Sequence, residues 1–61
     1  MTTLELLIMF DNSVKIVITG VSEYGYNTDG QIFWFIKNNR KSFVTPTGVA
    51  YFGSRFDFEV N

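Results

Sequence analysis

Residues 32 to 36 form an unbroken run of five large apolar side chains, IFWFI. Neighbouring side chains of a β-strand point to opposite faces of its sheet. One face of this strand would carry Ile32, Trp34 and Ile36. The other would carry Phe33 and Phe35. A chain of 61 residues has room for one small core, so the second face needs a cover: a closed barrel, a short helix, a second copy of the chain or a target protein.

The composition limits how so short a chain is stabilised. Residues 1–61 suffice for a single β domain, whose core rarely contributes more than about 3–5 kcal/mol. The sequence has no Cys and no His, which excludes disulfides and the usual zinc, haem and iron–sulfur sites, so no cofactor is expected. Of the usual supports, self-association remains. The alternative is a dense aromatic core, which seven Phe, three Tyr and one Trp would supply.

Charge and hydropathy limit the classes of partner that this chain is expected to bind. Six acidic and five basic residues give a net charge of −1, whereas a nucleic-acid-binding chain normally has a clear positive excess. Residues 1–10 lack the basic start of a secretory signal. The longest apolar runs fall far short of the ~20 residues that span a bilayer. We therefore expect a cytoplasmic protein without a membrane partner, and nucleic acid is disfavoured.

The first half of the chain predicts a β-hairpin. Residues 14–19 alternate between more and less apolar side chains, as a strand does. Residues 11–13, Asp-Asn-Ser, form a turn that leads back to residues 4–10. That first segment is ambiguous, because Thr2 and Glu5 have the spacing of a helical capping box. Strand is favoured, since the segment is short and a tight turn joins it to a strand.

Two turn signals organise the middle of the chain. Asp29-Gly30 suits a type I′ turn that pairs residues 24–28 with residues 31–37. Asn38-Asn39 predicts a second such turn, leading into a strand over residues 40–45.

The remaining residues are assigned by breaks and alternation. Residues 46–48, Pro-Thr-Gly, interrupt the chain, and residues 49–52 form a short strand or one helical turn. In the last segment we predict a strand whose inward side chains are Phe56, Phe58 and Val60. Its outward side chains are Arg55, Asp57 and Glu59.

The predicted fold is all-β. It is an antiparallel meander of five or six strands that forms an open barrel or a curled sheet. A short helix at residues 2–9 or 47–52 is the alternative to strand in those segments.

No residue pattern indicates catalysis. The commonest general base and the thiol nucleophile are missing. Asp57 and Glu59 would lie about 7 Å apart on one strand face, which superficially resembles a catalytic pair. Both are expected in solvent beside Arg55, so we predict that the protein is not an enzyme.

Three surfaces are candidates for binding. Leaving Ile32, Trp34 and Ile36 in water would forfeit about 1.5–3 kcal/mol each, so this face is the predicted self-association site of a homodimer. Tyr24 and Tyr26, set among Ser, Gly and Asn, have the composition of protein-binding surfaces. The predicted partner-binding residues are therefore these two tyrosines together with the basic residues around the second turn, Lys37, Arg40 and Lys41.

The functional prediction is a non-catalytic interaction module that binds and occludes a larger macromolecule. Size and the lack of catalytic residues are typical of phage or mobile-element accessory proteins that inhibit a host or defence protein. One alternative is a small nucleic-acid-binding β-barrel that uses the basic hairpin tip and the aromatic side chains. Another is a structural subunit of a larger assembly.

Overall fold

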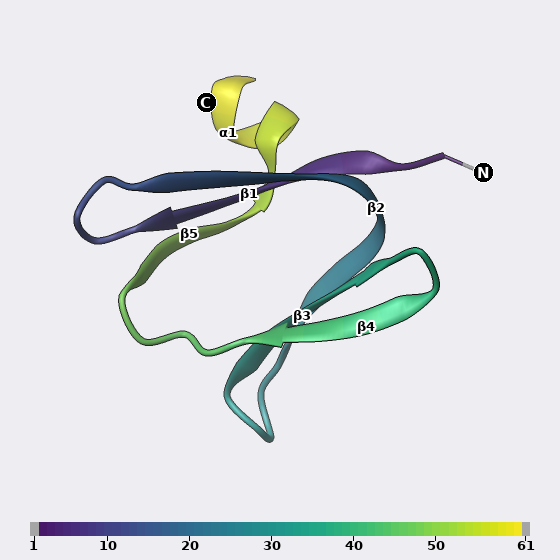
Figure 1. Ribbon diagram of the computed structural model, residues 1–61. Coiled ribbons are helices and arrows are strands. Elements are labelled where there is room, and N and C mark those ends of the chain that lie inside the picture. The colour runs from purple at the N-terminus through teal and green to yellow at the C-terminus, as the bar shows by residue number, and fades with distance from the viewer. Residues whose placement is uncertain (1, 61) are drawn as a thin grey trace.

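The computed structural model describes residues 2–60, which form one five-stranded antiparallel sheet and one short helix (Figure 1). In chain order the elements are β1 (Leu4–Phe10), β2 (Lys15–Asn27), β3 (Ile32–Lys37), β4 (Arg40–Val44), β5 (Val49–Ser54) and α1 (Arg55–Val60). The strand order is β4-β3-β2-β1-β5, and the edge strands β4 and β5 do not pair with each other. The sheet is therefore curled but open, which confirms the prediction of an all-β meander.

The long strand β2 bends near its middle and divides the sheet in two. Gly20 has a φ of +74°, which glycine adopts without steric cost. The pairing registers with β1 and with β3 both shift next to Val21, and such bulges sharpen a local bend. The first half-sheet contains β5, β1 and residues 15–20 of β2. The second half-sheet contains residues 21–27 of β2, with β3 and β4.

The hydrophobic core draws on the inner faces of both half-sheets. Its buried side chains are Leu6, Ile8, Val21 and Phe35. The partly buried side chains packed against them are Leu4, Phe10, Ile18, Tyr24, Val44, Val49 and Phe52. Burial of Phe35 agrees with the alternation predicted for the apolar run. So small a core is expected to provide only a modest free energy of unfolding.

Two of the predicted turns are confirmed. Asn38 and Asn39 have φ values of 54° and 62°, the left-handed conformation that both positions of a type I′ turn require. They connect the cross-strand pair Lys37 and Arg40. The turn at residues 11–13 is also formed, with the amide of Val14 donating to the Asn12 side chain at 3.1 Å.

The predicted type I′ turn at Asp29-Gly30 is wrong. Neither residue has a positive φ, whereas Gln31 has a φ of 51°. The side-chain oxygen of Asn27 accepts hydrogen bonds from the amides of Asp29 and Gly30, at 3.0 and 3.4 Å. This Asx turn extends the loop to residues 28–31 and moves the left-handed position to its last residue.

The largest error concerns the C-terminal segment, which is helix α1 and not a strand. Phe58 packs on Tyr51, but Phe56 and Val60 are 73% and 66% exposed, so the predicted inward set does not exist. Residues 2–9 and 47–52, where a helix was the alternative, hold parts of β1 and β5 instead. The alternating pattern misled because six residues fit either period.

The outward set of the predicted strand is rearranged as well. Arg55 and Glu59 lie one helical turn apart and form an ion pair at 2.9 Å. Asp57 occupies the first turn of α1, where a carboxylate is favourable. Asp57 and Glu59 therefore do not share a strand face, and their superficial resemblance to a catalytic pair is lost.

Candidate protein-interaction face

Helix α1 covers the outer face of the first half-sheet. It packs against β1 and β5, and the rings of Phe58 and Tyr51 lie 4.9 Å apart between their centroids. The ammonium of Lys15 lies 5.5 Å from the centre of the Phe58 ring. Leu7, on this same outer face, is only 3% exposed. The helix thus covers the β1–β5 part of this outer face, while Val17 of β2, which pairs with Leu7, remains 45% exposed.

The outer face of the second half-sheet has no such helix over it in the part of the chain that the structure describes (Figure 1). The pairing register places Trp34 between Gly25 on β2 and Phe43 on β4. Because paired residues of adjacent strands point the same way, four large apolar side chains share this surface. We call it the outer apolar face: Ile32, Trp34, Ile36 and Phe43.

Trp34 lies flat against its own sheet. A β-carbon built on Gly25 would come within 2.7 Å of the indole ring, so only glycine leaves room for the ring there. On the other side, the Lys41 ammonium lies 4.5 Å from the centre of the Trp34 ring and 5.9 Å from that of Phe43. Such cation–π contacts stabilise weakly at exposed sites. Phe43 remains 58% exposed.

The three residues predicted to mediate self-association do share one face. Ile32, Trp34 and Ile36 are, however, half-buried against their own neighbours. The free energy lost by leaving this face in water is therefore smaller than for three fully exposed side chains, since apolar stabilisation scales with the area removed from water.

The two predicted partner-binding tyrosines lie on the opposite, inner side of the second half-sheet. Tyr24 packs edge-on against Phe52, with ring centroids 6.1 Å apart. Tyr26 lies 4.9 Å from Phe33, which itself stacks on Phe52 at 4.3 Å. These rings form the rim of the core, and Tyr26 is still 46% exposed.

The basic residues are divided between the two faces. Lys37 and Arg40 form a cross-strand pair beside the tip of the β3–β4 hairpin. By strand alternation both lie on the inner side, at the end of β3 away from Tyr26. Lys41 lies on the outer apolar face. The structure therefore does not unite the five predicted partner-binding residues into one surface.

Phe43 was missed as a site residue, although the sequence contains the signal. A two-residue turn at Asn38-Asn39 fixes the register of the hairpin. Counting back from that turn pairs Trp34 with Phe43, as the structure has it. The most exposed aromatic side chain of the outer apolar face was therefore accessible to sequence reasoning.

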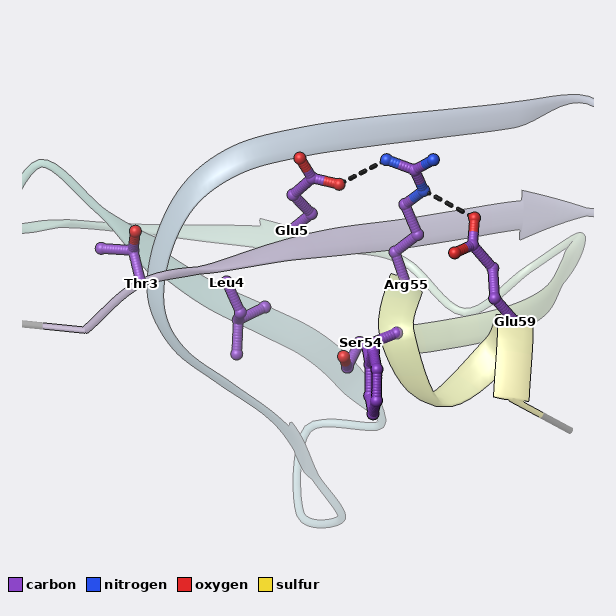
Figure 2. A pocket seen from close by; sticks show the side chains of 7 residues that line it. Thr3, Leu4, Glu5, Ser54, Arg55 and Glu59 are labelled. Carbon is purple, nitrogen blue, oxygen red and sulfur yellow. Dashed lines mark hydrogen bonds and ion pairs between the residues drawn. The ribbon is translucent and has the colours of Figure 1, made fainter.

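A separate open pocket of about 410 Å³ lies where α1 meets the start of β1 (Figure 2). Its lining residues are Thr3, Leu4, Glu5, Ser54, Arg55, Phe56 and Glu59. Arg55 lies between the carboxylates of Glu5, at 2.5 Å, and Glu59, at 2.9 Å. The hydrogen bond to Glu5, and to a smaller extent the one to Glu59, raises the pKa of Arg55. This ion-pair cluster ties the helix to β1.

A metal site, a membrane-spanning helix or similarity to a known protein would each indicate a class of function. Among residues 2–60, no group of three or more acidic, His or Cys side chains is arranged to hold a metal ion. No helix in that range is long and apolar enough to cross a membrane. A scan against protein-family models found no match, and neither did searches of curated proteins and of solved structures.

Proposed function

We propose that this chain is a non-catalytic protein-interaction module that self-associates through its outer apolar face. The observation that supports this proposal is the contrast between the two outer faces of the sheet. One is partly covered by α1, while the other leaves Phe43 58% exposed beside a half-buried Trp34. Aromatic side chains clustered on an uncovered surface are typical of protein interfaces, where tryptophan often dominates the binding free energy.

The second part of the proposal is that the self-associated protein binds and occludes a larger macromolecule. Tyr26 and Arg40 remain exposed, and both lie off the outer apolar face. A dimer built on that face would leave both residues free for a protein partner. Changing Tyr26→Ala or Arg40→Glu should then abolish a stoichiometric complex with the target while the dimer persists.

Self-association is tested by light scattering over a wide range of protein concentration. The wild type is expected to be a dimer that dissociates on dilution. Phe43→Glu should give a folded monomer, because it places a charge on the most exposed aromatic position of the outer apolar face. Phe56→Glu is the matched control, since Phe56 is also largely exposed, at 73%, but lies on α1, and it should remain dimeric. A wild type that stays monomeric at every concentration would refute the proposal.

One observation favours a second candidate function, binding of single-stranded nucleic acid. Trp34, Phe43 and Lys41 combine aromatic rings with a cation on an exposed sheet surface, as in base-stacking modules. Glu23 lies on the same face and opposes a phosphate backbone, which is why we rank this function second. Salt-sensitive binding of an oligonucleotide that is lost in Lys41→Glu would support it.

A further inference from the structure

The outer apolar face carries one charge of each sign, on opposite sides of its centre. Across the sheet, the register aligns Glu23 on β2, Ile36 on β3 and Lys41 on β4 in one row. Glu23 and Lys41 are both exposed. Two strand spacings of about 4.8 Å separate their backbones, and the Lys41 ammonium lies over the Trp34 and Phe43 rings, so the two charges stand on opposite sides of the face. The face is thus acidic along β2 and basic along β4.

This charge pattern is complementary to itself under one rotation. Two sheets that pack face to face are related by a twofold axis in the plane of contact, and such an interface uses the same patch twice. An axis parallel to β3 exchanges the β2 side with the β4 side and keeps each position along β3. Glu23 of each copy then lies opposite Lys41 of the other. An axis across the strands would instead put the β2 sides together and would leave both charges unpaired.

We propose that the partner of the outer apolar face is a second copy of this chain, related by a twofold axis along β3. Two reciprocal Glu23–Lys41 ion pairs flank a centre in which Ile36 meets its counterpart, beside the Trp34 rings over which Lys41 lies. This arrangement rests on the self-association proposed above and adds its geometry. Charge complementarity of this kind fixes orientation and register more than affinity.

The size of the face sets the expected strength of the dimer. Three strands of about six residues cover roughly 14 by 20 Å. That is about 300 Å² per copy, below the roughly 800 Å² per partner of a standard interface, so we expect a weak dimer that dissociates in the range of hundreds of micromolar, on the order of 10⁻⁴ M. Changes to two flanking ion pairs are readily measured in so weak a dimer.

The test uses two charge reversals, Glu23→Lys and Lys41→Glu. Each variant alone places like charges at both contacts, so its dimer dissociation constant should rise about tenfold or more. An equimolar mixture restores opposite charges at both contacts and should form a heterodimer with near wild-type affinity. The double variant E23K/K41E should regain a homodimer. Native mass spectrometry of one tagged and one untagged variant counts the heterodimer, and sedimentation equilibrium gives the constants.

Matched controls separate the contact from net charge. Arg40→Glu changes the net charge by the same amount as Lys41→Glu. Arg40 precedes Lys41 on β4, so its side chain points to the inner face, away from the proposed contact. Asp29→Lys likewise matches Glu23→Lys in the loop after β2. Both controls should dimerise like the wild type.

The outcomes distinguish this geometry from the proposed function. Suppose the wild type dimerises and Phe43→Glu does not, but the charge reversals neither weaken the homodimer nor form heterodimers. The twofold arrangement is then wrong, while self-association through this face stands. If the wild type never dimerises, or if Phe43→Glu dimerises normally, the proposed function is wrong and the arrangement with it.

Discussion

The two outer faces of this sheet both carry large apolar side chains, but they differ in how much of that surface the chain itself covers. On the first half-sheet, Leu7 is 3% exposed on the face that α1 covers. On the second half-sheet, Phe43 is 58% exposed and no helix covers its face in the described part of the chain. The comparison indicates that this short chain covers part of one outer face with its own C-terminal segment, while the described residues place no such segment over the other.

Chain order explains which face α1 covers. Helix α1 follows β5 directly, so it lies beside the first half-sheet, where Phe58 packs on Tyr51 and Arg55 pairs with Glu5. The β3–β4 hairpin lies in the middle of the chain and is closed by the two-residue turn at Asn38-Asn39. Neither of its short flanking loops is long enough to form a covering layer.

The sharpest test of the comparison truncates one aliphatic side chain on each outer face. Leu7→Ala should lower the free energy of unfolding by about 2–5 kcal/mol, because it leaves a cavity at a fully covered site. Ile36→Ala should cost only about 1 kcal/mol, since its half-buried side chain already contacts water. Urea unfolding at a concentration where the protein is monomeric measures both values.

The Leu7→Ala substitution can unfold the protein, and this outcome is part of the prediction. A loss of 2–5 kcal/mol approaches the whole stability of about 3–5 kcal/mol expected for so small a core, so an unfolded Leu7→Ala chain agrees with the prediction. Equal costs for the two variants would contradict it, because they would mean that both outer faces are covered within one chain.

The next prediction concerns the close packing of Trp34 on its own strand. Gly25→Ala places a β-carbon 2.7 Å from the indole, and overpacking of this kind costs about 1–3 kcal/mol. The indole should be pushed toward solvent, which shifts its fluorescence to the red. Gly30→Ala is the control, because the new β-carbon would lie 3.5 Å from the Ile32 side chain, an ordinary van der Waals contact. An unchanged emission spectrum in Gly25→Ala would contradict the described position of the ring.

Sequence reasoning succeeded where turns fix the register. The turn after Phe10 and the Asn38-Asn39 turn define two hairpins, and alternation within the apolar run placed Phe35 in the core and Trp34 outside. Phe43 follows from the same register but was not carried through to the site. The sequence therefore contained the information needed to place Phe43 beside Trp34.

The C-terminal helix was harder to predict, because Phe56, Phe58 and Val60 alternate with charged residues as in a strand. Two local signals favoured a helix. Ser54 and Asp57 have the spacing of a capping box, and Arg55 and Glu59 have the i,i+4 spacing of a helical ion pair. The proposed cover of the second outer face has no local signal, since a second copy of the chain would supply it.

A smaller effect is expected on the covered side, where the Tyr51 hydroxyl donates to the Ser54 carbonyl at 2.9 Å. Tyr51→Phe should lower the free energy of unfolding by about 0.5–1.5 kcal/mol. Tyr26→Phe, whose exposed hydroxyl lies on the rim of the core, should have little effect. Thermal unfolding followed by circular dichroism compares the two, and equal losses would contradict a specific role of the Tyr51 hydrogen bond.

The same tyrosine predicts a pH dependence. Burial, followed by the negative charge of Asp57, raises the pKa of Tyr51 above its ordinary value. The folded state therefore holds this proton more tightly than the unfolded state, whose tyrosine pKa is about 10. The stabilisation is complete below that value and is lost as the pH rises through the folded pKa. Tyr51→Phe should remove this alkaline loss of stability, and a persisting loss of equal size would assign it to other groups.

The smallest effect is expected at the ion-pair cluster that ties α1 to the first half-sheet. Arg55 bonds the carboxylates of Glu5 and Glu59 (Figure 2), but all three side chains are exposed, and water and salt screen such pairs. Arg55→Gln should lower the urea midpoint less than Tyr51→Phe does, and added salt should erase the difference from the wild type. Arg40→Gln serves as the control at the uncovered end of the molecule. A loss in Arg55→Gln larger than that in Tyr51→Phe would mean that the ion pairs, and not the packing of Phe58, hold the helix over its face.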